Sequence, residues 1–241
     1  MIDVHSHIIP GVDDGSKTME HTMVLAYKAY SQGIKTIFAT PHSEAFLDNP
    51  KNVLDGYHAM KAFLSKFLKD LDIYLGCEIL CSEEKMGVIL AALDAEQIPS
   101  MNETRCVLVE FPSWISKGEI KECVSVLWEK NWIPIIAHVE RYKNITGDLN
   151  FVADLRKLGC LIQINIYHLE ESGDSMIQEW TQNLVLNEFV DFLGTDMHEL
   201  DLRPPSVEQG LSWLEENCSE SYFDSITRSN AVEKLLLHKM K

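Results

Sequence analysis

Residues 1–15, MIDVHSHIIPGVDDG, place two histidines and two adjacent aspartates around a short apolar segment at the start of the chain. Residues 2–7 alternate in a way that is typical of a β-strand. Side chains two apart in a strand point to the same side, so His5 and His7 are expected to project together. The start of the chain therefore predicts a strand that carries two imidazoles to one face.

Further short apolar segments follow, separated by longer amphipathic ones. The predicted strands are 2–7, 34–40, 73–79, 106–111, 133–138, 160–166 and 190–195. The predicted helices are 18–32, 50–68, 83–93, 120–130, 150–158, 175–188, 206–217 and 230–239. Seven strand–helix repeats without hairpin signals predict an α/β fold with a parallel sheet, most simply a closed barrel. No linker or break in composition divides the chain, which predicts a single domain over residues 1–241.

Composition excludes several classes of protein. The chain has 241 residues, is 46% hydrophobic and carries a formal net charge of −16. This acidity argues against binding to nucleic acid or to anionic membranes. The sequence has no apolar run of membrane-spanning length and no secretory signal. Six cysteines lack a CxxC pair, as expected for reduced thiols in the cytoplasm.

Histidines and carboxylates recur at or near the ends of the predicted strands. These residues are His5, His7, His42, Glu78, Glu110, His138, Asp196 and His198. The carboxyl ends of parallel strands meet at the face where α/β barrels build their active sites. Imidazoles and carboxylates without thiolates suit Mn²⁺, Fe²⁺ or Zn²⁺, and they exceed the needs of one tetrahedral ion. The pattern therefore predicts a cluster of two or three divalent cations.

An ordinary structural role is the alternative for each histidine taken alone. That interpretation suits His21, His58 and His238, which fall in predicted helices. It is also favoured slightly for His168, after the sixth predicted strand. For the whole set it fails, because a cluster of buried charges without a metal is costly.

The motifs at these positions resemble those of a known family. HxH at the start, ATPH, LVEFP, AHVERY and GTDMHELDLRPP occur in this order along the chain. They resemble the PHP (polymerase and histidinol phosphatase) metallophosphoesterases, and among these the bacterial capsule and exopolysaccharide tyrosine phosphatases. The resemblance implies a distorted (β/α)7 TIM-like barrel and a site of three ions, typically manganese.

The resemblance also implies ligands for each ion. One ion would take His5, His7, Glu78 and Asp196; a second Glu78, Glu110 and His138; the third Asp14, His42 and His198. Of the two aspartates in VDDG, the motif assigns the second as a ligand. Asp13 is expected to orient the loop, and Asp3 to support a ligating histidine.

Arg141 and Arg203 lie close in sequence to the candidate ligands. A guanidinium binds phosphate oxygens in a bidentate manner, so both are candidate substrate-binding residues. The alternative for each is an ordinary ion pair, for example with Glu140 or Asp201. The predicted reaction is attack of a metal-bound hydroxide on the phosphorus of a phosphomonoester. The resemblance implies a phosphotyrosine protein as substrate, and in particular the tail of a bacterial tyrosine kinase.

Other mechanisms lack their motifs, and three other functions stay open. No cysteine has an arginine six positions later, and no GxGxxG or Walker loop is present. A small-molecule phosphatase of the histidinol-phosphate type would use the same ions. A metal-dependent nuclease also begins with HxH, although the acidity disfavours it. A non-catalytic metal-binding scaffold would bind the ions without turnover.

Overall fold

The computed structural model describes residues 1–170 and 173–240. The strands are β1 (Ile2–Ser6), β2 (Thr36–Ala39), β3 (Asp72–Leu75), β4 (Glu78–Leu80), β5 (Cys106–Glu110), β6 (Ile133–Ile136), β7 (Leu161–Asn165) and β8 (Phe192–Gly194). All strand pairs are parallel. One sheet has the order β1-β2-β3 and the other β4-β5-β6-β7-β8. The α/β fold with parallel strands is therefore confirmed.

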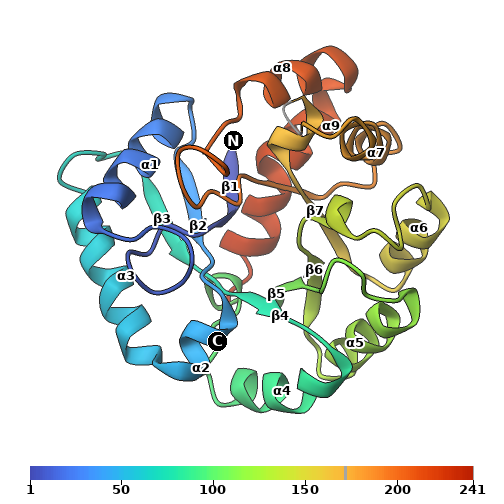
Figure 1. Cartoon of the computed structure of the whole chain (residues 1–241), viewed down its shortest axis with the longest axis horizontal. Helices are drawn as coiled ribbons and strands as arrows, with labels where there is room; N and C mark the ends of the chain where they lie inside the picture. The colour runs from blue at the N-terminus through green and yellow to red at the C-terminus, as the bar shows by residue number, and fades with distance from the viewer. Residues whose placement is uncertain (171–172, 241) are drawn as a thin grey trace.

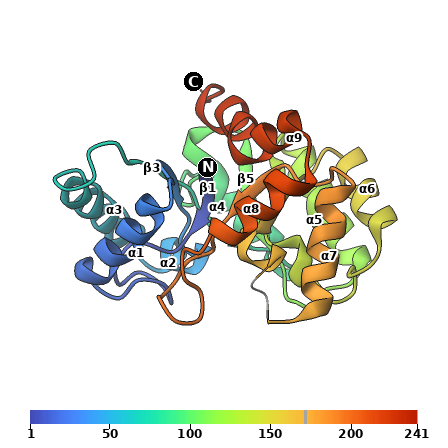
Figure 2. The same cartoon turned by 90° about the horizontal axis from the view of Figure 1, so that it is seen from above.

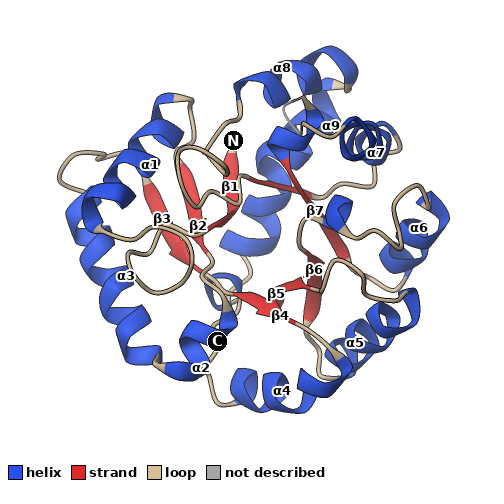
Figure 3. Ribbon diagram, viewed as in Figure 1, coloured by secondary structure: helices blue, strands red, loops and turns tan. Residues whose placement is uncertain are grey.

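Helices surround the strands on the outside of the molecule (Figures 1 and 3). They are α1 (Met19–Ser31), α2 (Ser43–Asp48), α3 (Pro50–Leu64), α4 (Met86–Asp94), α5 (Lys117–Glu129), α6 (Leu149–Lys157), α7 (Ser175–Leu186), α8 (Glu208–Asn217) and α9 (Glu220–Asp224). The 3₁₀ turns in the described part of the chain are η1 (Glu83–Lys85), η2 (Met101–Glu103), η3 (Val139–Arg141) and η4 (Ile166–Leu169). Among the described residues, no helix is both long and apolar enough to cross a membrane.

Local sequence explains where the longer helices begin. Thr18 caps α1 by accepting a hydrogen bond from the backbone N–H of His21. Ser116 and Glu119 form a reciprocal capping box at the start of α5. Such caps satisfy backbone donors that have no partner inside the helix. As a result, α1 begins one residue after its predicted start, whereas α5 begins three residues before its predicted start.

The two sheets also touch through single residue pairs. Isolated parallel bridges join Ser6 to Met197 and His42 to Glu78. The first links the end of β1 to the segment after β8, and the second links the segment after β2 to the start of β4. Both bridges involve residues next to or within the candidate ligand set, so contact between the sheets helps to assemble the site.

The third predicted strand is wrong in one respect. Residues 73–79 form two strands rather than one, since β3 ends at Leu75 and β4 begins at Glu78. Between them lies Gly76, where an added Cβ would lie 2.6 Å from Met101 Sδ. β3 pairs with β2 while β4 pairs with β5. Glu78 therefore opens a strand instead of lying near the end of one.

The predicted helix 230–239 is also wrong in form. After α9 the backbone continues in two π-helical turns, η5 (Ser225–Ser229) and η6 (Val232–Leu236). Leu235 is buried against an apolar cluster that includes Ile2 and Leu108, whereas Leu237 is exposed. The short helix α2 was not predicted.

Figure 2 shows this C-terminal segment on the side opposite the loop of residues 199–206. Ala231 and Leu235 pack in an apolar cluster that includes Ile2, Cys106 and Phe192, the first residues of β1, β5 and β8. The carboxyl ends of the strands face the other way, where the loops carry the polar candidates. The apolar interior thus supports the site from below without occupying it.

Candidate metal centre

The histidine pair at the end of β1 converges as predicted. Nε2 of His5 and Nε2 of His7 are 3.2 Å apart, and both rings are fully buried. Each Nε2 faces one oxygen of Glu78, with His5 at 3.2 Å from Oε1 and His7 at 3.1 Å from Oε2. The carboxylate of Glu78 therefore lies across both imidazoles.

Glu78 is the central residue of the cluster, with an exposed fraction of 1%. His138 Nε2 lies 2.8 Å from its Oε1, and His42 Nδ1 lies 3.1 Å from its Oε2. Glu110 approaches the same rings, at 3.3 Å from His42 Nδ1 and 3.9 Å from His138 Nε2. Glu78 and Glu110 thus share His42 and His138 as neighbours.

Asp196 joins the cluster from the segment after β8. Its Oδ1 lies 3.6 Å from His5 Nε2 and 3.5 Å from His7 Nε2. Asp196 has a φ of 51°, in the left-handed region, so it is not part of an extended strand. Asp196 and His198 therefore do not alternate along a strand, since β8 ends at Gly194, although both residues reach the site.

Asp14 contacts both His42 and His198. Its Oδ1 lies 3.2 Å from His42 Nε2 and 3.2 Å from His198 Nε2. All nine predicted ligands are thus brought together. The ligand atoms fall into four overlapping groups: His7, Asp14, His42 and His198; His5, His7 and Asp196; His5, Glu78 and His138; His42, Glu78 and Glu110. By contrast, His21, His58 and His238 are in none of these groups.

The cluster keeps the carboxylates of Glu78 and Asp14 ionised. Burial alone would raise the pKa of Glu78, but the neighbouring rings of His5 and His138 outweigh it and lower the pKa well below its usual value. The nearby imidazoles of His198 and His42 likewise lower the pKa of Asp14 far below its usual range. Charged carboxylates at such positions are suitable ligands for hard divalent cations.

The imidazole of His7 responds in the opposite sense. Burial would lower the pKa of His7, but its contacts with Asp13 and Glu78 raise the pKa to about 10. The acidic groups around His7 therefore favour a positive charge there, which a proton on this ring supplies when no cation is bound.

Unpartnered buried atoms test whether cations fit. Among the described residues, Glu78 Oε2 and His198 Nε2, which both face the cluster, are buried without a well-aligned hydrogen bond. Such orphaned polar atoms are costly in a protein interior. Together with the convergence of Nε2 atoms from His5 and His7, they fit residues that hold cations better than a closed hydrogen-bond network.

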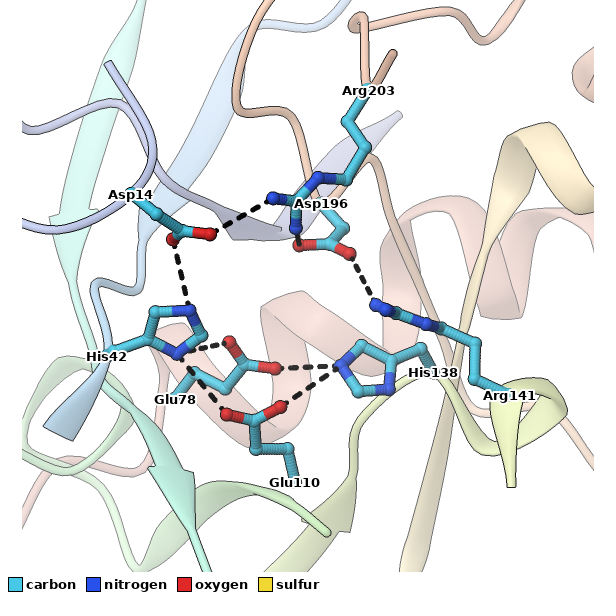
Figure 4. Close-up of a pocket in the computed structure, with 8 residues that line it drawn as sticks. All are labelled: Asp14, His42, Glu78, Glu110, His138, Arg141, Asp196 and Arg203. Carbon is cyan, nitrogen blue, oxygen red and sulfur yellow. Dashed lines mark hydrogen bonds and ion pairs between the residues drawn. The ribbon is translucent and has the colours of Figure 1, made fainter. Parts of the chain in front are cut away.

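Figure 4 shows the two arginines at the edge of the ligand cluster, with their guanidinium groups turned toward it. Arg141 Nη1 lies 3.2 Å from Asp196 Oδ2, and Arg203 Nη2 lies 3.1 Å from Asp14 Oδ2. Their partners are therefore candidate ligands rather than Glu140 or Asp201. Both arginines and six candidate ligands line one cavity of about 300 Å³: Asp14, His42, Glu78, Glu110, His138 and Asp196.

Asp13 and His168 have supporting positions. Asp13 Oδ2 lies 2.8 Å from His7 Nδ1, and its Oδ1 accepts a hydrogen bond from the N–H of Gly15. This agrees with the expectation that Asp13 orients the loop. His168 is buried with its Nδ1 2.7 Å from Glu140 Oε1. It lies outside the four ligand groups, as the structural interpretation expects.

Asp3 contacts the candidate ligand His5, as expected, but through the backbone of His5 and not through its ring. Its carboxylate accepts hydrogen bonds from the backbone N–H of His5 and from Thr195. The ring of His5 instead contacts Gln163, whose neighbour Asn165 contacts Asp196. Neither amide was selected from the sequence. The available signal was the segment LIQIN, where two polar residues interrupt an otherwise apolar predicted strand.

Fold and site together define an α/β protein that presents a histidine and carboxylate cluster, with two arginines, at the carboxyl ends of parallel strands. The chain belongs to the capsular polysaccharide synthesis family CpsB/CapC, whose model matches residues 1–236. The resemblance seen in the sequence is therefore confirmed.

Individual relatives agree. The chain is 31% identical over 216 residues to the tyrosine-protein phosphatase CpsB of Streptococcus pneumoniae, covering 87% of each protein. It is similar to a solved structure from the pair YwqE of Bacillus subtilis and CpsB of Streptococcus pneumoniae, described as metal-dependent tyrosine phosphatases. That match has a TM-score of 0.87 at 28% identity, over 100% of this chain and 96% of the other. A histidinol phosphate phosphatase of Lactococcus lactis shares the fold, with a TM-score of 0.53 at 16% identity over 82% of this chain and 86% of the other.

Proposed function

We propose that this chain is a metal-dependent phosphomonoesterase that removes phosphate from tyrosine residues of a protein. The observation that carries the proposal is the shared cavity, where Arg141 and Arg203 border the candidate metal ligands. A phosphoryl group there would meet guanidinium donors on one side and cations on the other. The names of the relatives as tyrosine-protein phosphatases support this choice of substrate.

The proposed centre holds three divalent cations, with manganese favoured over iron or zinc. We assign one ion to His5, His7, Glu78 and Asp196, the second to Glu78, Glu110 and His138, and the third to Asp14, His42 and His198. When bound, the cations supply an activated water as nucleophile and neutralise charge on the phosphoryl oxygens. The overlapping groups of ligand atoms support more than one ion.

The protein's own groups bind and orient the phosphate. Arg141 and Arg203 now pair with Asp196 and Asp14, and cations on those carboxylates would leave the guanidinium groups able to face a substrate. Arginine binds phosphate oxygens through two parallel hydrogen bonds, which fixes the direction of the ester bond. A phenol has a pKa of about 10, so a tyrosine leaves with less need for protonation than an alkoxide.

A second hollow lies beside the cavity that holds the candidate ligands, and its lining favours an aromatic phosphoester as substrate. Its volume is about 390 Å³, and it shares Asp14, His42 and Glu110 with the first cavity. Apolar side chains of Val12, Ala45 and Leu80 form part of its wall. A tyrosine ring attached to a phosphate in the first cavity would have an apolar surface within reach.

The biological setting is part of the proposal. We place the substrate in the tail of a bacterial tyrosine kinase that governs capsule or exopolysaccharide production, since a flexible tail can enter a recessed site. All six cysteines are free thiols, which supports a cytoplasmic protein. The two sheets, bridged at Ser6–Met197 and His42–Glu78, support a distorted (β/α)7 barrel in one domain.

The test compares substrates and metals. Purified protein is assayed on a phosphotyrosine peptide and on histidinol phosphate, before and after treatment with a chelator and again after addition of Mn²⁺. We expect turnover of the peptide that chelation abolishes and Mn²⁺ restores. A clear preference for histidinol phosphate would assign the small-molecule alternative instead, and cleavage of DNA with Mn²⁺ would assign a nuclease.

A matched pair of histidine variants separates an enzyme from a scaffold. His42→Ala removes a residue of the cluster, whereas His58→Ala removes an exposed histidine of α3. We expect loss of phosphatase activity only in His42→Ala. Protein that binds its metals but shows no turnover of either phosphoester would be a non-catalytic scaffold.

A further inference from the structure

β7 lies between two strands whose ends lead to candidate ligands, yet it supplies none of the nine. β6 leads to His138 and β8 to Asp196. In their place, β7 presents the amides of Gln163 and Asn165, both fully buried. Two primary amides in the interior of a strand are expensive unless each of their polar atoms has a partner.

The contacts of Gln163 fix which way its amide points. Its Oε1 accepts a hydrogen bond of 2.9 Å from the backbone N–H of His138. A backbone N–H can only donate, so the atom that it meets must be the amide oxygen. The same oxygen lies 3.1 Å from Nδ1 of His5. Nδ1 of His5 must therefore carry a proton, which leaves Nε2 as the atom that faces Glu78 and Asp196.

The direction of Gln163 in turn fixes Asn165. Nε2 of Gln163 donates to Oδ1 of Asn165 at 3.1 Å, so Nδ2 of Asn165 is left to donate to Asp196 Oδ2 at 3.1 Å. Arg141 also donates to that Oδ2. With Oδ2 occupied, Oδ1 of Asp196 is the oxygen that faces the rings of His5 and His7.

The neighbouring backbone is shaped around this arrangement. At Gly194 of β8, an added Cβ would lie 2.6 Å from His5 Cβ and 2.9 Å from Gln163 Nε2. His138, whose N–H holds Gln163, has a φ of 31° in the left-handed region. Such a conformation costs free energy and persists only where its surroundings hold it.

We propose that Gln163 and Asn165 form an amide relay, a chain of directed hydrogen bonds that positions His5 and Asp196 for one cation. The relay starts at the N–H of His138, passes through both amides and ends at Asp196. It sets the tautomer of His5 and determines which oxygen Asp196 presents to the cation. Gln163 and Asn165 are positioning residues, and this inference rests on the metal centre of the proposed function.

The primary test measures Mn²⁺ binding to metal-free protein by titration calorimetry. Gln163→Met and Asn165→Leu keep approximate side-chain size and remove the hydrogen bonds. Loss of a residue that orients a metal ligand typically weakens metal binding 10- to 100-fold, and we expect about this loss for one ion in each variant. Gln182→Leu is the control, because Gln182 is partly buried and donates to the carbonyl oxygen of Leu169, and neither residue belongs to the ligand groups.

The double variant Gln163→Met/Asn165→Leu tests the chain itself. In a relay, Asn165 is directed by Gln163. The double variant should therefore bind Mn²⁺ only slightly less tightly than whichever single variant has the lower Mn²⁺ affinity. Losses that multiply would show two independent supports and overturn the relay. Unchanged Mn²⁺ affinity in both single variants would overturn it as well.

A spectroscopic measurement separates positioning from general damage. In Zn²⁺-loaded protein labelled with ¹⁵N, the Nδ1–H of His5 should give a hydrogen-bonded proton signal. Gln163→Glu keeps an acceptor for this proton and should keep the signal, whereas Gln163→Met should lose or shift it. An identical signal in Gln163→Met would contradict the assignment.

The glutamate variant also keeps the test decisive if Gln163→Met fails to fold. Should the wild-type protein bind neither Mn²⁺ nor Zn²⁺, the proposed function itself fails. If the wild type binds these ions and the variants bind them with the same affinity, only the relay is overturned and the proposed function stands.

Discussion

Nε2 of His5 and Nε2 of His7 face each other at 3.2 Å in the protein interior. Nδ1 of each ring is already engaged, with Gln163 for His5 and with Asp13 for His7. Two nitrogen lone pairs at this distance repel unless a proton or a cation lies between them. The pair therefore makes the stability of the folded protein depend on what occupies the site.

Removal of metal should lower the melting temperature. At a free Mn²⁺ concentration one hundred times the Kd, binding of one ion adds about 2.7 kcal/mol to the free energy of unfolding. For a chain of this size that corresponds to roughly 5–10 °C. Differential scanning calorimetry with chelator and with added Mn²⁺ measures the shift. A melting temperature that changes neither with chelator nor with added Mn²⁺ would contradict a metal centre at His5 and His7.

Arg141→Ala should reduce phosphatase activity without unfolding the protein. Hydrogen bonds to a charged group contribute about 1.5–3 kcal/mol, so kcat/KM for a phosphotyrosine peptide should fall about 10- to 100-fold. Arg105→Ala is the matched control, since Arg105 precedes β5 and lies over the Trp132 ring instead of in the cavity. Equal activity in the two variants would exclude Arg141 from phosphate binding.

Much of the site was predictable because its ligands follow strands. An apolar segment followed by histidine or a carboxylate is a local pattern, and parallel strands bring their carboxyl ends to one face. His5, His7, Glu110 and His138 were found in this way. Family resemblance then selected Asp14 over Asp13, a choice that residue chemistry alone leaves open.

Features that depend on partners distant in sequence were not predictable. The break between β3 and β4 separates a strand that pairs with β2 from one that pairs with β5, and no local pattern records these partners. Gln163 and Asn165 gain their roles only from His5, His138 and Asp196, each on another strand or loop. A sequence shows which side chains are unusual for a strand, but the partner that justifies each one appears only in three dimensions.

Leu80→Ala should weaken binding of aromatic phosphoesters selectively. The substitution removes apolar surface from the second hollow, at about 0.8 kcal/mol for each buried CH₂. We expect KM for a phosphotyrosine peptide to rise about 5- to 30-fold while hydrolysis of O-phosphoserine changes little. Leu54→Ala, on the exposed side of α3, provides the control. Proportional losses on both substrates would place the tyrosine ring elsewhere.

Alkaline pH should destabilise the fold through its buried thiols. Burial raises the pKa of Cys160 to about 12 from an ordinary value of about 9. Between these values the folded chain retains a proton that the unfolded chain has lost, so the free energy of unfolding falls as pH rises. At pH 10.5 the loss from Cys160 is about 2 kcal/mol.

Cys160→Ala isolates this effect. The variant is destabilised at pH 7 by its lost packing, and that difference from wild type should shrink by about 2 kcal/mol at pH 10.5. Urea unfolding at both pH values measures it. A stability difference that stays constant with pH would show that the pKa of Cys160 is the same in the folded and unfolded states.

Gly194→Ala should damage the metal centre through a single methyl group. The added Cβ would lie within 3 Å of both His5 Cβ and Gln163 Nε2, and relief of such overlap costs typically about 1–3 kcal/mol. Since the displaced groups are the ring of His5 and the amide that directs it, Mn²⁺ affinity should fall together with stability. Gly87→Ala is the control, because Gly87 lies in α4 with open space around its Cβ position and alanine favours helix. Gly194→Ala protein that binds Mn²⁺ as tightly as wild type would mean that His5 can shift without consequence, and the close packing of β8 on the centre would then have no part in holding the metal.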